Sequence, residues 1–217
     1  MRHGGRAVTA QDFSDLALES SRAVARAVTL TPSFSPISQA NGPLTGPADL
    51  GRDGQVIVVI VPSQVQVRAS PSSDLCAEVE DYLRARCAPD ARVTVIGPSW
   101  VATDVAIQMV ATSLDRTDSV IAAVRSAVIG LLDPLTGGDR GTGWDFGRCP
   151  RASDFVARLA DVPDIDHVSS ITVTCDPAFK DLDPATELTI DELSLFPRLL
   201  AYARTVTVNG SSPQVVS

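Results

Sequence analysis

The residues best suited to bind a ligand lie together between Leu131 and Gly147, a stretch with five glycines, two large aromatic side chains and three aspartates. A glycine-rich loop of this kind could cradle a phosphate with its backbone amides. A P-loop, however, follows a strand and ends in Gly-Lys-Ser or Gly-Lys-Thr, so that a lysine contacts the phosphates. This stretch follows an apolar run typical of a helix, has no lysine, and its Asp139 and Asp145 would repel a phosphate. The sequence therefore argues against a phosphate site here.

The three aspartates could in principle bind Ca²⁺, because carboxylate oxygens are its usual ligands. Their spacing, at Asp133, Asp139 and Asp145, matches no calcium-binding loop. Asp133 and Asp145 are better interpreted as hydrogen-bond acceptors for loop amides. We therefore predict neither a metal nor a cofactor.

Four cysteines are spread along the chain without a Cys-x-x-Cys pair and without a nearby histidine at metal-binding spacing: Cys76, Cys87, Cys149 and Cys175. Each is expected to be a small buried hydrophobic residue. Cys76 and Cys87 fall on one predicted helix, too far apart along it to form a disulfide.

Nucleophilic catalysis needs a nucleophile beside a base, and the chain offers few candidates for the base. His3 lies near the N-terminus, and His167 lies in a predicted turn, where a solvated histidine is the default. The chain has no Gly-x-Ser-x-Gly motif, and carboxylate pairs such as Asp74 and Glu78 fit a solvated helix face. We therefore predict that the protein is not an enzyme, and keep a hydrolase or nucleotide-binding enzyme as the weaker alternative.

The 217-residue chain has a formal net charge of −8, a pI of about 4.7 and 44% hydrophobic residues. This acidic balance argues against nonspecific nucleic-acid binding, which depends on basic residues; the cluster of Arg84, Arg86 and Arg92 is interpreted as solvated surface. The longest apolar run, Val56 to Val61, is far shorter than the roughly 20 residues that a membrane span needs. The N-terminal residues carry no apolar stretch typical of a secretory signal. We expect a globular protein that binds no nucleic acid and does not insert into a membrane.

The elements that position these residues fall into two groups. The first, over residues 6–97, is expected to run helix, strand, strand, helix, strand. Its helices begin at cap patterns, Thr9 to Asp12 and Ser72 or Ser73, and its strands are expected at 23–30, 55–61 and 92–96. Prolines and glycines within residues 32–54 predict an extended arm rather than a helix or an inner strand.

The second group, over residues 98–208, is expected to follow a similar order. Strands are predicted at 101–111, 168–175 and 203–208, and a long helix begins at Thr117 and Asp118. The glycine-rich loop over residues 133–148 leads to a short helix capped by Ser153. Residues 209–217 are predicted to be a polar tail. The fold class is α+β, with two small helix-on-sheet units in tandem.

Trp144 and Phe146 indicate that the glycine-rich loop is ordered. A loop that merely connects two elements has no need of large aromatics, which are normally buried, and its glycines permit sharp turns around them. Two interpretations stay open for Trp144. Its ring packs against the chain's own helix over residues 120–132, or it is an anchor for a partner, since aromatics dominate interface hot spots.

The loop also resembles a known family. Its motifs DPLTGG (133–138) and GTGWDFGR (141–148) are similar to the C-terminal signature of baseplate J-like proteins, the wedge components of contractile phage tails and tail-derived injection systems. Three weaker stretches fit the same family: RAVTAQDF (6–13), RVTVIGP (92–98), and residues 153–168, which hold a short helix and a turn. Two features depart from the family pattern. The chain starts almost at the first of these stretches, and its turn has Pro163-Asp164 where glycine is common.

This resemblance implies a structural baseplate wedge subunit without cofactor, in repeated copies around a six-fold ring that links the hub or spike to the sheath. The implied partners are other wedge proteins, hub or spike proteins and sheath-proximal proteins, with assembly in the cytoplasm into a particle that can be released. The residues expected at an interface are Trp144, Phe146, Pro134, Arg140 and Arg148. The alternative to this function is a cytosolic oligomeric adaptor without catalytic activity.

Overall fold

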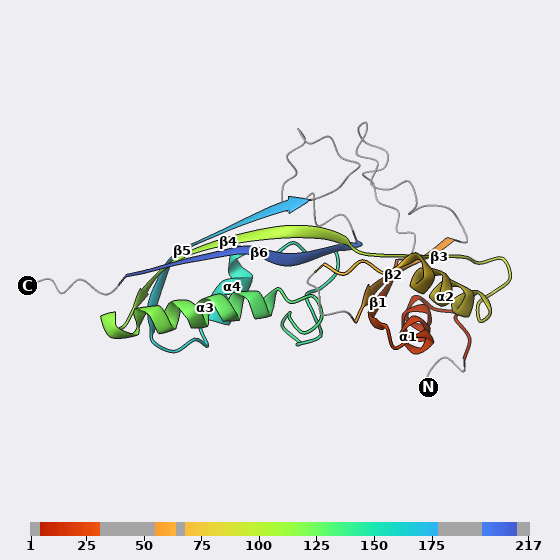
Figure 1. The fold of residues 1–217 in the computed structure, drawn as a ribbon, viewed down its shortest axis with the longest axis horizontal. Coiled ribbons are helices and arrows are strands. Elements are labelled where there is room, and N and C mark those ends of the chain that lie inside the picture. The colour runs from red at the N-terminus through yellow and green to blue at the C-terminus, as the bar shows by residue number, and fades with distance from the viewer. Residues whose placement is uncertain (1–4, 31–54, 64–67, 178–196, 212–217) are drawn as a thin grey trace, which may run out of the picture. The chain divides into compact units, whose positions relative to one another are not determined.

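The computed structural model describes residues 5–30, 55–63, 68–177 and 197–211. It has an α+β fold with four α-helices and two three-stranded sheets (Figure 1). The described residues form two compact units, one of residues 5–99 with 197–198 and the other of residues 100–177 with 199–211. The predicted arm over residues 32–54 lies outside the described residues, as does His3.

The elements follow one another along the chain as α1 (Ala10–Ser20), β1 (Val24–Leu30), β2 (Gln55–Pro62), α2 (Ser73–Arg84), β3 (Arg92–Ile96), β4 (Ser99–Ala111), the 3₁₀ helix η2 (Leu114–Arg116), α3 (Thr117–Leu131), α4 (Ala152–Leu159), β5 (Ile165–Pro177) and β6 (Leu199–Ser211).

The first unit is a sheet in the order β1-β2-β3, with β1 and β2 antiparallel and β2 and β3 parallel. The helices α1 and α2 pack on this sheet and against each other. Apolar residues of both helices and all three strands form the core: Phe13, Leu16, Ala17, Val24, Val58, Ile60, Val79, Leu83, Val93 and Val95. In the strand that the sequence predicted at residues 55–61, Ile57 to Val61 are all buried.

The cap patterns predicted at the two helices of this unit are confirmed. Thr9 and Asp12 form a capping box, in which the Thr9 amide donates to Asp12 Oδ2 at 2.7 Å and the Asp12 amide donates to Thr9 Oγ1 at 3.2 Å. At α2, Ser72 Oγ accepts a hydrogen bond from the Leu75 amide at 3.2 Å. Each cap satisfies amides that have no partner inside the helix.

The second unit is a sheet in the order β5-β4-β6. β4 and β5 are antiparallel, and Thr103, Val105 and Ile107 of β4 stand opposite Cys175, Val173 and Ile171 of β5. Side chains alternate between faces along a strand. The odd-numbered residues of β4 from Val101 to Ala111 are buried, whereas Ala106 and Gln108 are exposed.

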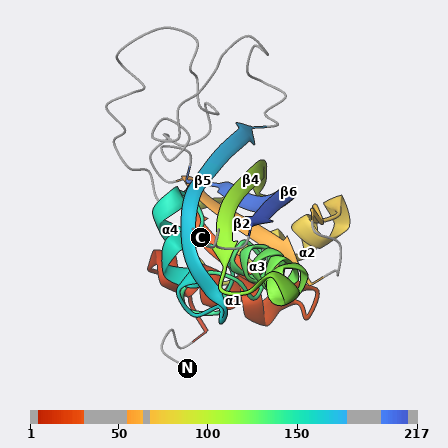
Figure 2. The same ribbon diagram turned by 90° about the vertical axis from the view of Figure 1, so that its left-hand side faces the viewer.

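Two helices cover the buried face of this sheet. α3 packs on β6, α4 packs on β5, and the two helices contact each other (Figures 1 and 2). α3 directs Val120, Val124 and Val128 inward, at the spacing of one helix face. The glycine-rich loop joins the end of α3 to the start of α4, so both of its ends are anchored on this layer.

Several sequence predictions for the second unit were wrong in detail. Its order is strand, helix, helix, strand, strand, so it does not repeat the order of the first unit. β5 and β6 are longer than predicted, and β6 runs to Ser211, into the predicted polar tail. α4 begins at Ala152, so Ser153 lies inside the helix; its first turn is closed by Asp154, which accepts from the Arg151 amide at 2.8 Å.

Candidate functional site: the glycine-rich loop

The glycine-rich loop (residues 133–148) is held by its own backbone hydrogen bonds. The Gly138 amide donates to the Leu131 carbonyl at 2.8 Å, and the Gly143 amide donates to the Gly137 carbonyl at 2.8 Å. At the far end of the loop, the Gly147 amide donates to Leu199 of β6 at 2.8 Å. The loop is therefore an ordered part of the second unit, as its aromatics predicted.

Asp133 organises the turn that follows α3. Its Oδ1 accepts from the amides of Leu135 (2.8 Å) and Thr136 (2.6 Å) and from the Thr136 hydroxyl (2.9 Å). Its carbonyl accepts from Gly137 at 3.0 Å and from Trp144 at 3.1 Å. The prediction that Asp133 satisfies loop amides is confirmed, and the residue ties both arms of the loop together.

Two glycines are required by close backbone approach. A Cβ at Gly137 would lie 2.4 Å from the Leu131 carbonyl oxygen, and one at Gly138 would lie 2.7 Å from the Gly143 carbonyl oxygen. Gly138 also has a φ of +71°, which costs other residues free energy. These positions let the two arms of the loop touch.

Trp144 fills the interior of the loop. Its side chain is fully buried, and its Nε1 donates to the Arg148 carbonyl at 2.7 Å. The burial and this hydrogen bond place the indole inside the chain's own loop, whereas its packing against the helix over residues 120–132 stays a prediction. The indole therefore supports the loop from inside and, in this conformation, presents no surface to a partner.

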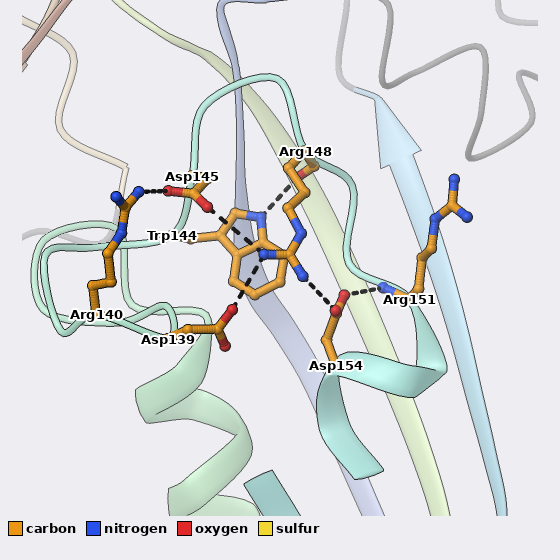
Figure 3. A network of polar contacts seen from close by, with 7 residues as sticks. All are labelled: Asp139, Arg140, Trp144, Asp145, Arg148, Arg151 and Asp154. Carbon is orange, nitrogen blue, oxygen red and sulfur yellow. Dashed lines mark hydrogen bonds and ion pairs between the residues drawn. The ribbon is translucent and has the colours of Figure 1, made fainter. Parts of the chain in front are cut away.

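Arg148 crosses the open side of the indole and joins the loop to α4. Its guanidinium lies 4.8 Å from the centre of the Trp144 ring and forms ion pairs with Asp154, with Asp139 at 3.5 Å and with Asp145 at 3.7 Å (Figure 3). Burial disfavours its charge, but the attraction of Asp154 and Asp139 outweighs this cost and raises the pKa of Arg148. The side chain is thus a charged cover over the aromatic core of the loop.

The outer side of the loop is charged and exposed. Arg140 pairs with Asp145 at 3.2 Å, and the Arg140 side chain is 78% exposed. Asp145 therefore pairs with two arginines, Arg140 and Arg148, whereas the sequence suggested that it accepts hydrogen bonds from loop amides. Among the residues expected at an interface, Arg140 is exposed, Phe146 and Arg148 are half-buried, and Pro134 is buried. An interface role for these residues stays a prediction.

The other candidate sites offer fewer groups that could bind a ligand or catalyse a reaction. A hollow of about 460 Å³ after α2 is lined by Arg84, Cys87, Pro89 and Arg92, but Arg84 is already paired with Glu80. His167 pairs with the adjacent Asp166 at 2.8 Å, and both are more than half exposed. In the described part of the chain, no three His, Cys, Asp or Glu residues are grouped as metal ligands, and none of the helices there is long and apolar enough to cross a membrane.

Two arrangements were not found from the sequence, because their members are far apart in it. On the exposed face of the second sheet, Arg204 pairs with Asp104 and with Asp176 at 2.6 Å, so that one guanidinium links β6 to both other strands. In the turn before β5, Asp164 has a φ of +65° and pairs with Arg116 at 2.7 Å. Asp164 is the position at which the resemblance expects glycine, and its backbone adopts the conformation that glycine favours.

Comparisons with solved structures reveal a similarity in fold. No family model matches the chain, and no curated protein matches it. A chain in the cryo-electron microscopy structure of the anti-feeding prophage baseplate, 6-fold symmetrised, has a similar fold, with a TM-score of 0.57 and 14% identity. The similarity covers 93% of this chain but 38% of that chain, so this chain spans well under half of its structural neighbour.

Proposed function

We propose that this protein is a structural component of the baseplate of a contractile injection system or contractile phage tail. The observation that carries the proposal is the similarity in fold to a chain of the anti-feeding prophage baseplate, which extends over 93% of this chain and hence over both units. The motifs of the glycine-rich loop support the same assignment independently, because they were identified from sequence alone.

We further propose that the protein is a baseplate J-like wedge subunit. In this role it occurs as repeated copies in a six-fold ring, with contacts to other wedge proteins, to hub or spike proteins and to sheath-proximal proteins. It assembles in the cytoplasm and leaves the cell only as part of the particle. Its part in contraction is conformational, with contacts to neighbours broken and remade when the baseplate changes state, and it is not catalytic.

The glycine-rich loop is proposed as one contact of this subunit with a neighbour. Its interior is rigid, because Trp144 is buried and hydrogen-bonded. Its outer surface presents Arg140, which is 78% exposed and pairs with Asp145, and Asp139, which is 70% exposed and pairs with Arg148. Exposed ion pairs of this kind contribute about 0–1 kcal/mol to folding, whereas arginine is enriched among interface hot spots. A charge reversal at Arg140 therefore separates binding from folding.

The test is deletion of the gene in the native cells, with complementation by wild type or variant and counting of sheathed particles by negative-stain electron microscopy. Deletion should abolish complete particles, and wild type should restore them. Arg140→Glu should fold normally but fail to restore them. Arg125→Glu, which reverses an exposed charge on α3, is the matched control and should restore them.

The two parts of the proposal fail in different ways. Unchanged particles after deletion would contradict the baseplate role itself. Full rescue by Arg140→Glu would leave the baseplate role standing and remove the loop contact.

A further inference from the structure

Cys149 and Cys175 are brought together by the second unit although they are far apart in sequence. Cys149 directly follows the glycine-rich loop and is 1% exposed, whereas Cys175 lies near the end of the edge strand β5 and is half-buried. The Cys149 side chain lies close enough to the Cys175 thiol to shift its pKa. Neither cysteine is part of a disulfide.

The sheet register explains why the two thiols meet. Cys175 stands opposite Thr103 in the antiparallel β4–β5 pair, and paired residues project to the same face. Thr103 is fully buried on the face that α3 and α4 cover. Cys175 therefore points toward this layer, where the chain between the glycine-rich loop and α4 places Cys149.

We propose that Cys149 and Cys175 are a site of disulfide formation, which covalently ties the glycine-rich loop to the edge strand β5 when the protein meets a low-molecular-weight disulfide such as oxidised glutathione. This inference rests on the contacts within the second unit and not on the proposed baseplate role. It adds a covalent constraint to the loop, which otherwise is held by hydrogen bonds and by the Arg148 ion pairs.

The reaction is an exchange of two thiols for one disulfide. The Cys175 thiolate attacks the small disulfide, so that a bond forms to Cys175 Sγ and one small thiol leaves. The Cys149 thiol then loses its proton and attacks Cys175 Sγ, which releases the second small thiol. Both cysteines are oxidised, the small disulfide is reduced, and the two protons end on the two released thiols.

The environments of the two thiols fit a reaction in which Cys175 attacks first and Cys149 second. Cys175 is the accessible member, and the hydrogen bond from Cys149 lowers the pKa of the Cys175 thiol, although burial opposes this. A lower pKa increases the thiolate fraction that attacks a disulfide. In the first unit, by contrast, burial raises the pKa of the Cys76 thiol, and the negative charge of Glu80 adds to this. Cys76 is therefore a natural internal control.

The test uses the full chain, reduced and then equilibrated with increasing ratios of oxidised to reduced glutathione. Alkylation and mass spectrometry of the unreduced peptides should identify a Cys149–Cys175 link, with Cys76 and Cys87 still alkylated. Because the link closes a loop of roughly 25 residues, thermal unfolding of the oxidised protein should rise by about 5–10 °C. Adding a reductant should reverse both changes.

Variants make the result specific. Cys149→Ser should stop at a mixed disulfide of glutathione with Cys175, whereas the double variant Cys76→Ser, Cys87→Ser should form the link as the wild type does. Equal modification of all four cysteines at every ratio would overturn the proposal. So would glutathione retained on Cys175 while Cys149 stays a free thiol in the wild type.

Discussion

Replacement of Trp144 is the strongest perturbation that the structure suggests for the second unit. An indole buries about 200 Å², which at about 25 cal/mol per Å² gives up to about 5 kcal/mol of favourable burial. Its Nε1–H adds a hydrogen bond to the Arg148 carbonyl at 2.7 Å, a contribution of about 1 kcal/mol. Trp144→Ala should therefore lower the free energy of unfolding by about 3–5 kcal/mol.

Trp144→Phe isolates the hydrogen bond from most of the burial. Phenylalanine keeps an aromatic ring but leaves the Arg148 carbonyl without its donor, so we expect a loss of about 2 kcal/mol. Trp100 is the matched control in the same unit. Its indole packs edge-on against Tyr202 at 6.2 Å, and its buried Nε1 has no hydrogen-bond partner among the described residues. Trp100→Phe should therefore change stability by no more than about 0.5 kcal/mol.

Urea unfolding of the full-length variants measures both effects. The chain has two tryptophans, and both lie in the second unit, so the fluorescence of the one that remains reports unfolding of that unit. The midpoint should fall in Trp144→Phe with an unchanged denaturant slope, which marks a change in stability alone. Equal midpoints for the Trp144→Phe and Trp100→Phe variants would refute the argument that Trp144 is the internal support of the loop.

Substitutions at three further positions test individual contacts. Asp133→Ala leaves two loop amides without their acceptor and should lower the free energy of unfolding by about 1–3 kcal/mol in urea; an unchanged midpoint would contradict its role in the turn. Asp164 has a φ of +65°. The free energy of unfolding of Asp164→Gly should stay within about 1 kcal/mol of wild type, because relief of the left-handed backbone offsets loss of the Arg116 pair. Asp164→Ala should melt at a lower temperature than Asp164→Gly, and the reverse order of melting temperatures would contradict this. The hydrogen bond from Arg204 lowers the pKa of Asp104, so its stabilisation is present above the unfolded pKa of about 4 and is lost as the pH falls through the folded value. Asp104→Asn should therefore lower the melting temperature at pH 7. Between pH 5 and pH 2 its melting temperature should fall less than that of wild type, and parallel pH profiles for the two proteins would contradict this stabilising role of the Asp104 carboxylate.

The sequence predicted a helix, strand or loop well where the residue pattern that indicates it lies within that element itself. The Thr9–Asp12 capping box, the β-branched run of β2 and the alternation in β4 each depend on neighbours along the chain. The glycine-rich loop was predicted to be ordered for the same reason, since its glycines and aromatics lie within one short stretch.

What the sequence could not predict depends on contacts between distant segments. The pairing of Arg204 with Asp104 requires the strand order, and the meeting of Cys149 with Cys175 requires the β4–β5 register. The start of α4 was misplaced because Ser153 is a common cap residue, whereas the structure closes the turn with the Asp154 carboxylate and the Arg151 amide. β6 was predicted too short because its exposed polar residues beyond Val208 are typical of a tail as well as of an edge strand.

The baseplate role is tested most directly by locating the protein on native particles. A tagged chain, purified gently from its own cells, is labelled with gold through the tag and viewed by negative-stain electron microscopy. Sheathed tubular particles with gold confined to one end are expected. A small oligomer that carries the tag, with no tube or sheath protein detected by mass spectrometry, would contradict this role.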